Sequence, residues 1–471
     1  MATATATNVE IHPTDKMLSL GDLFLLGIQH IAAMCAGAMA VPIILGNSLG
    51  LSQEDIHLLV SASFMMAGLG TLIQTLGIKN IIGSRLPMVE GVSFAGVAAL
   101  SAIGMTYRAA DPIMGLQIMF GATLVSGLFC FLMAPVFGKL LKFFPPLVSG
   151  TVVTCMGLSL IPVAIRWAGG GNPGSADFGN FKNIFLAIIT LVIIIAIQKV
   201  SKGFLGNIAI LLGIVAGTII AIFMGVADFS SVKEVGLVTF NTPLKFGMPK
   251  FELTSILSLF LVQLVIMTDA TGNQLNLSNI CGTDEKDEKR LIAGLRAHGL
   301  SSMLAGIFNT FPHSLFGQNV GIAAITGVAS RFVGTAAGVI LLLVSFFPKL
   351  TSIFTSIPSP VLGGAGIVMF GIVAANGIKR LGEVNYVGNK NLMIVATSIG
   401  LALVPIAVPE IFKHFPAWGK ILFQSAVTLG CLSVLILNII FNELGKKKNK
   451  KIKIKNKSII NGYLNNIDLE N

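Results

Sequence analysis

Apolar stretches of about 20 residues recur along this chain, and they constrain its fold more than any other feature. A helix needs roughly 20 apolar residues to cross the hydrocarbon core of a bilayer. Uninterrupted stretches of this kind occur at 21–45, 53–77, 112–136, 146–166, 180–198, 204–226, 254–278, 290–310, 332–348, 359–378, 391–410 and 420–442. The pattern predicts an all-α polytopic membrane protein.

Two further apolar segments, 84–104 and 312–330, are interrupted by Pro, Gly and polar residues. Counted as broken spans, they are third and tenth of fourteen, the same position in two halves of seven. Such pairs are typical of transporters built from inverted repeats. A helix that begins in mid-membrane directs free N–H groups and a positive dipole end at a polar ligand. We therefore expect fourteen transmembrane segments in a 7+7 arrangement; the plainer alternative is two proline-kinked helices.

Composition and charge limit the class of protein and its orientation. Hydrophobic residues make up 54% of the chain and charged residues only 11%, against about 25% charged in soluble domains. A water-soluble enzyme and a disordered chain are excluded. An even number of spans places both termini on one side, and the excess of Lys and Arg in alternate loops assigns the N-terminal tail (1–20) and the basic tail (443–471) to the cytoplasm. Eight Lys between Lys446 and Lys457 indicate a tail near anionic lipid, not nucleic-acid binding.

Polar side chains within apolar spans are costly and mark functional sites. Two acidic residues lie deep in the expected spans, Glu90 and Asp269. Asn273 follows Asp269 by four residues and shares its helix face. The expected first span carries Gln29 and His30, and the ninth carries His298. The candidates for a polar or proton-carrying network are Gln29, His30, Glu90, Asn273 and His298.

The motifs favour transport over catalysis. HExxH and Walker A sequences do not occur, and the five Cys are scattered without a CxxC pair, so we expect neither enzyme activity nor a metal site. The function class that remains after these exclusions is secondary transport of a polar, planar or anionic solute. Asp269 would supply an acceptor, Gln318 and Asn319 amide groups, and Phe94 an aromatic face.

Several of these residues carry a resemblance to a known family. Gln29-His30 is similar to a paired motif in the first span of the nucleobase:cation symporter-2, or nucleobase–ascorbate, transporters. Gln318-Asn319-Val320-Gly321 followed by Thr326-Gly327 resembles the signature of that family, and Asn309-Thr310-Phe311-Pro312 and Ser93-Phe94 also match. The resemblance covers roughly 20–442. The nearest branch looks like the bacterial xanthine and uric acid permeases, and Gln318 favours oxidised purines.

The resemblance implies an architecture and a site. A core domain would comprise 21–136 and 254–348 (spans 1–4 and 8–11), and a gate domain 146–226 and 359–442 (spans 5–7 and 12–14). Spans 3 and 10 would each hold a short strand and a half-helix, with the purine between the strands. The assembly would be a homodimer in the bacterial plasma membrane. The substrate-binding residues would be Asp269, Gln318, Asn319, Phe94 and Ser93.

Three departures from the family pattern bear on coupling. Asp269 stands where the family has a longer Glu, Asn273 replaces a frequent Asp, and His298 replaces another. His titrates near neutral pH and could still relay a proton, with Glu90 as a compensating acid. The expected coupling ion is a proton, with Na⁺ as the alternative, and Asp269, His298, Glu90 and His30 are its candidate carriers.

Other functions stay open at this point. One is a uracil permease of the same family, and another is an anion exchanger or channel of the same fold. Against the second stands Asp269, because a carboxylate in the site repels anions. A non-transporting membrane receptor or enzyme is the third.

Overall fold

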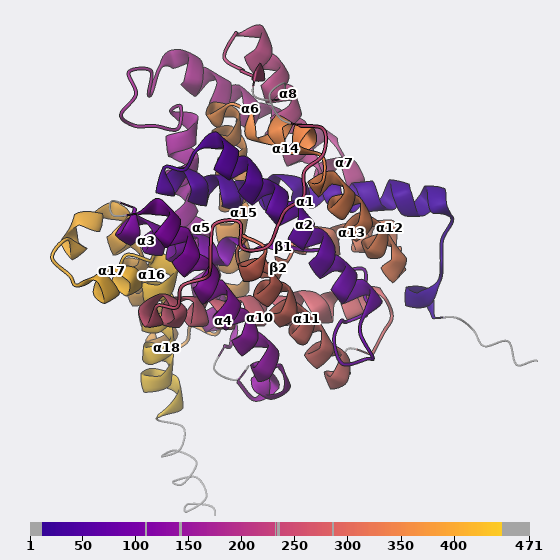
Figure 1. The fold of residues 1–471 in the computed structure, drawn as a ribbon. Coiled ribbons are helices and arrows are strands. Elements are labelled where there is room, and N and C mark those ends of the chain that lie inside the picture. The colour runs from indigo at the N-terminus through magenta and orange to yellow at the C-terminus, as the bar shows by residue number, and fades with distance from the viewer. Residues whose placement is uncertain are drawn as a thin grey trace, which may run out of the picture.

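The protein is described by a computed structural model at residues 12–108, 111–140, 144–230, 232, 236–284 and 287–444. The predicted basic tail lies almost wholly outside these ranges. The chain is mostly helical (Figure 1). Its first half contains α1 (Leu20–Leu49), α2 (Gln53–Leu76), β1 (Glu90–Val92), α3 (Val97–Tyr107), α4 (Pro112–Leu140), α5 (Pro146–Ala168), α6 (Phe181–Val200), α7 (Phe204–Asn207) and α8 (Ala209–Phe223). Its second half contains α10 (Leu253–Ile280), α11 (Glu288–Ile307), β2 (His313–Leu315), α12 (Gly317–Thr326), α13 (Arg331–Ser345), α14 (Pro348–Thr355), α15 (Ser359–Leu381), α16 (Lys390–Ala407), α17 (Ala417–Phe423) and α18 (Ala426–Asn438).

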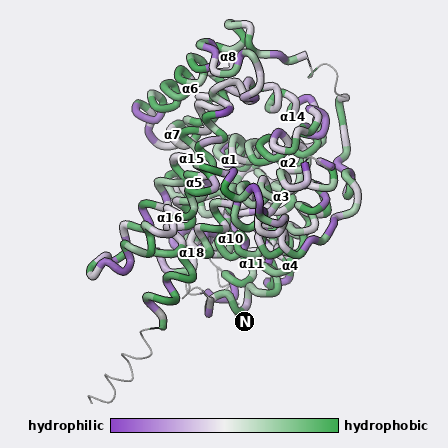
Figure 2. Tube along the Cα trace, turned by 90° about the vertical axis from the view of Figure 1, so that its left-hand side faces the viewer, coloured by the Kyte–Doolittle hydropathy of each residue, from purple (hydrophilic) through white to green (hydrophobic). Residues whose placement is uncertain are grey.

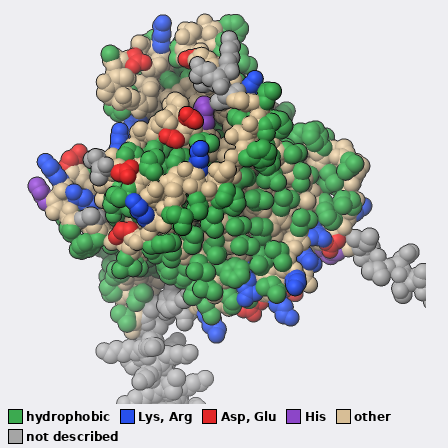
Figure 3. Space-filling model, viewed as in Figure 1, with side chains coloured by type: hydrophobic (Ala, Val, Ile, Leu, Met, Phe, Trp, Pro, Cys, Tyr) green, Lys and Arg blue, Asp and Glu red, His purple; other side chains and the backbone are tan. Residues whose placement is uncertain are grey.

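Eight helices of the described part are long and apolar enough to cross a membrane. A ninth span results if α13 and α14, bent by 89° at their junction, are counted as one, and three shorter apolar helices add to the set. Hydrophobic residues predominate along the helices in Figure 2. In Figure 3 they form a broad apolar expanse on the surface, with Lys and Arg along its lower border. This distribution is that of a multi-pass membrane protein.

Most of the predicted uninterrupted segments are single helices with ends close to the expected positions, but two are divided and a third ends at a bend. Segment 204–226 consists of α7 and α8, 420–442 is shared between α17 and α18, and 332–348 ends in the sharp bend before α14. Ser425 caps the start of α18 by accepting a hydrogen bond from Thr428 N. Pro348 occupies the first turn of α14, where its missing N–H is tolerated.

The two interrupted segments meet near the middle of the molecule. β1 and β2 pair antiparallel, with Glu90 opposite Leu315 and Val92 opposite His313. α3 and α12 lie on opposite sides of the strand pair in Figure 1. Prolines precede both strands, and Pro87 and Pro312 are unable to donate a backbone hydrogen bond to a helix. Pairing the strands satisfies backbone groups that would otherwise be exposed at membrane depth.

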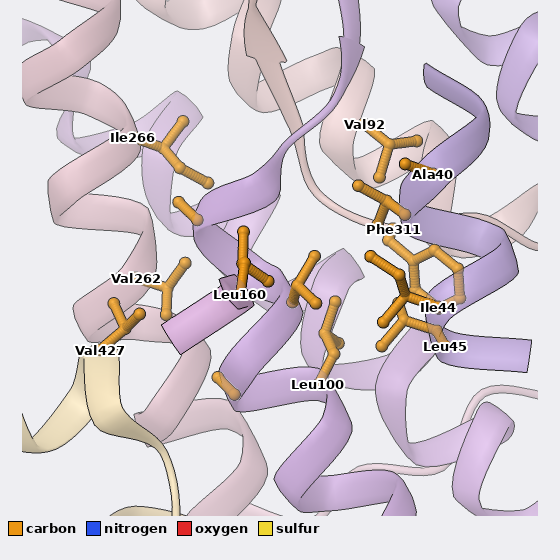
Figure 4. Close-up of a cluster of buried hydrophobic side chains, with 14 of the residues drawn as sticks. Ala40, Ile44, Leu45, Val92, Leu100, Leu160, Val262, Ile266, Phe311 and Val427 are labelled. Atoms are coloured by element: carbon orange, nitrogen blue, oxygen red, sulfur yellow. The ribbon is translucent and has the colours of Figure 1, made fainter. Parts of the chain in front are cut away.

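Helices far apart in sequence form the main packing contacts. α5 packs most extensively against α15, α4 against α11, and α2 against α13. The largest apolar cluster lies around the interrupted segments, where Ile44 and Leu45 of α1 approach Leu100 of α3 and Phe311 (Figure 4). The strand pair is therefore surrounded by tightly packed apolar side chains.

Candidate substrate-binding site

A cavity of about 560 Å³ lies beside the strand pair. Its walls come from the two interrupted segments and from α5, α10 and α15. Val92, Ser93, Phe94 and Ala95 line it from the first segment, and residues 314–318 and Val320 line it from the second. Both strands end here, α12 begins here at Gly317, and the first segment continues here into the helical turn Phe94–Gly96 that precedes α3. Backbone N–H groups at the starts of two helical stretches therefore lie at the cavity.

Aromatic rings form one wall of the cavity. Phe94 and Phe316 both line it, and Phe94 packs edge-on against Phe370 with ring centroids 5.6 Å apart. Gly37 of α1 makes room for both lining rings, because a Cβ there would lie 2.6 Å from Phe316 Cε1 and 3.2 Å from Phe94 Cε2. Ser93 Oγ accepts a hydrogen bond of 3.2 Å from Ala95 N and caps the helical turn that follows. The site thus offers an aromatic face to a planar ligand.

The acidic wall of the cavity comes from α10. Asp269 and Asn273 lie one turn apart, and Asn273 Nδ2 donates to Asp269 Oδ2 over 3.1 Å. The other carboxylate oxygen, Oδ1, accepts from Arg380 Nη2 of α15 at 2.5 Å. Glu383, Lys379 and Asn376 also line this side. Arg380 was not anticipated from the sequence, because its position at the end of an apolar segment indicated a cytoplasmic loop.

The neighbouring amides of α12 have different surroundings. Gln318 is exposed and lines the cavity. Asn319 is buried and is not among the described lining residues; its Nδ2 donates to His30 Nδ1 at 3.0 Å and to the His30 carbonyl at 2.9 Å. Gln29, which precedes His30 in α1, is half-buried, and its Oε1 has no hydrogen-bond partner in the described part of the chain. Asn319 and His30 therefore join α12 to α1, whereas Gln318 faces the ligand space.

A second polar cluster lies behind the strands. Glu90 of β1 is fully buried, and its two carboxylate oxygens lie 2.7 and 2.8 Å from Nδ1 of His298 in α11. Gln74 Nε2 donates to Glu90 Oε1 at 2.7 Å, and the Glu90 N–H donates to Thr71 Oγ1 at 3.0 Å. Glu90 and His298 thus form a pair that the sequence alone left as two separate candidates.

This polar cluster continues to His313 of β2, whose Nδ1 lies 2.7 Å from Ser301 Oγ. The Nε2 atoms of His298 and His313 are buried and have no hydrogen-bond partner among the described residues. Sequence reasoning singled out neither Gln74 nor His313. The signal that could have identified His313 is its place next to the Pro of the second interrupted segment.

Taken together, the helical membrane fold and the polar cavity at paired broken segments define a membrane permease. Residues 21–411 match the Xan_ur_permease family model, described as the Permease family. The uric acid transporter UacT of Escherichia coli (strain K12) is 42% identical over 91% of this chain and 88% of its own length. The xanthine permease of Bacillus subtilis (strain 168) is 40% identical over 91% of this chain and 95% of its own.

The fold is also that of known solved structures. The transmembrane domain of the cyanobacterium bicarbonate transporter BicA aligns with a TM-score of 0.61 at 18% identity, covering 89% of this chain and 97% of that one. At that identity the likeness concerns the fold alone. The family match and the relatives above establish that the chain belongs to the nucleobase:cation symporter-2 permease family.

Proposed function

We propose that this protein is a secondary active transporter that imports an oxidised purine, xanthine or uric acid, across the plasma membrane. The observation that carries the proposal is the cavity itself, where Asp269, Gln318 and Phe94 face one space from three elements. A planar oxopurine would pack on Phe94 and place its polar edges against Gln318 and the acidic wall. Relatives at about 40% identity are named for these purines.

The architecture we propose is fourteen spans in two inverted halves of seven. The packing pairs support it. In this arrangement α2 and α11 are the second spans of their halves, and α4 and α13 are the fourth. The α4–α11 contact and the α2–α13 contact then each join the fourth span of one half to the second span of the other. The core domain would comprise 21–136 and 254–348, and the gate domain 146–226 and 359–442. Both termini would lie in the cytoplasm of a bacterial cell, and two copies would form a homodimer.

Coupling to protons is the second part of the proposal. Glu90 and His298 are both buried, and their side chains are in direct contact. With one shared proton the pair is neutral overall, and without it the pair carries one negative charge. Because burying net charge is costly, loading and release of that proton would change the relative stability of two transporter conformations. His30 and Asp269 are further candidate carriers.

The test is uptake of radiolabelled xanthine and urate by cells that lack their own purine permeases. We expect saturable uptake of at least one purine, competition between the two, and loss of accumulation when a protonophore collapses the proton gradient. Replacing Na⁺ by K⁺ in the medium separates Na⁺ coupling from proton coupling. Uptake of uracil or bicarbonate without any purine uptake would overturn the substrate assignment and leave only the fold.

A further inference from the structure

The ion pair between Asp269 and Arg380 connects two of the elements that line the cavity. Asp269 belongs to α10 and Arg380 to the last turn of α15. Their side chains are 31% and 28% exposed, respectively, and both line the cavity. The pair is therefore neither a buried structural bridge nor a freely solvated surface contact. It lies where a ligand would be, and a ligand must either displace it or join it.

Asp269 would oppose an anionic ligand if it stood alone. The described lining residues with formal charge are Asp269, Glu383, Lys379 and Arg380, two of each sign. The charge beside the Asp269 carboxylate is offset by Arg380, which is in hydrogen-bond contact with it. Without that guanidinium, the acidic wall would repel an anion at close range.

Arg380 also has donors to spare. A guanidinium has five N–H donors in a planar fork and binds planar anions in a bidentate manner. Among the described residues, the contact with Asp269 Oδ1 is the one hydrogen bond that its side chain makes. The remaining donors can bind the oxygen and the deprotonated nitrogen along one edge of a planar ring while the Asp269 contact persists.

We propose that Arg380 is a specificity-determining residue that allows the cavity to take an anionic purine. This inference rests on the proposed function. Uric acid has lost a proton at neutral pH, whereas xanthine is largely neutral there, so the two purines differ in the charge that Arg380 would meet. A cavity with Asp269 and Arg380 accepts both; a cavity with Asp269 alone accepts the neutral purine and disfavours urate.

The test compares urate with xanthine transport in the Arg380→Gln variant of the full chain. We expect kcat/KM for urate to fall at least about tenfold more than that for xanthine, which corresponds to about 1.4 kcal/mol. Arg380→Lys keeps the charge and loses the planar fork. Its ratio of kcat/KM for urate to kcat/KM for xanthine should therefore lie between that of Arg380→Gln and that of the wild type. Lys379→Gln removes one charge from the same wall without removing the Asp269 contact, and we expect a smaller change in ratio.

The ratio of the kcat/KM values for the two substrates, measured on one membrane preparation, does not change when part of the protein fails to fold. If Arg380→Gln carries neither purine, Kd values for urate and xanthine on the purified variant replace the uptake rates, with the same tenfold difference expected. An unchanged ratio, by either measure, overturns the inference while the proposed function stands. If the wild type itself carries neither purine, the proposed function fails instead.

Discussion

At the scale of single residues, substitutions of the adjacent amides Gln318 and Asn319 are expected to affect different properties, substrate binding and stability respectively. Asn319→Ala removes two buried hydrogen bonds to His30, and leaving buried polar groups unpaired costs about 1–3 kcal/mol. We expect a lower Tm in detergent. Gln318→Ala removes an exposed side chain of the cavity wall, so KM for the purine should rise while Tm stays within error. Equal Tm losses in both variants would contradict this division.

The Glu90–His298 pair gives a second prediction at this scale. Glu90→Gln keeps the shape of the side chain, and its amide can still accept from Gln74 and donate to a neutral His298, but it no longer takes up a proton. We expect accumulation against a gradient to be lost, while exchange of internal for external purine continues. Both are measured in proteoliposomes with an imposed pH gradient. Undiminished proton-driven accumulation in this variant would remove Glu90 from the coupling mechanism.

These residue-level contacts mark the limit of what the sequence could predict of the site. Asp269 and Asn273 could be assigned to one helix face, because both belong to the same apolar segment. Glu90 and His298 are 208 residues apart, and only the fold brings them into contact. Arg380 was missed because a cation at the end of an apolar segment is usually a loop residue of the cytoplasmic side.

At the scale of elements, α1 leaves room for the aromatic wall because Gly37 has no side chain. Gly37→Ala places a Cβ 2.6 Å from the Phe316 ring, so this ring, which lines the cavity, must shift. We expect KM for the purine to rise several-fold, together with a stability cost of about 1–3 kcal/mol from overpacking. Gly400→Ala in α16 is the matched control, because nothing lies within 4 Å of a Cβ there. A similar rise in KM in the control would remove Phe316 as the cause.

Hydropathy predicts elements well where a span is continuous and poorly where it is divided. The predicted 53–77 and 146–166 lie close to α2 and α5, because each is a continuous apolar helix, the first capped by Ser52 and the second with Pro146 in its first turn. The divisions at α7–α8 and α17–α18 are invisible to a hydropathy window, since the residues on both sides are apolar. The strand pair between the interrupted segments also depends on the tertiary fold, because each strand is only three residues long and has no stability alone.

At the scale of the whole molecule, the proposed mechanism divides the helices into two bodies that move past each other. α4 belongs to the proposed core domain, whereas α6 and α16 belong to the proposed gate domain. Spin labels at cysteines introduced at Lys139 and Lys390 would span the two bodies, and labels at Lys199 and Lys390 would both lie on the gate domain. All three Lys are exposed, and all five native Cys are buried, so the introduced sites should react first.

Distance distributions between the labels test this division directly, with and without saturating xanthine. We expect the Lys139–Lys390 distribution to change and the Lys199–Lys390 distribution to keep its mean, because a ligand shifts the populations of states that differ between bodies and not within them. If both distributions change together, α6 and α16 are not one rigid body. If neither changes while xanthine is bound, the substrate alone does not shift the populations of the conformations.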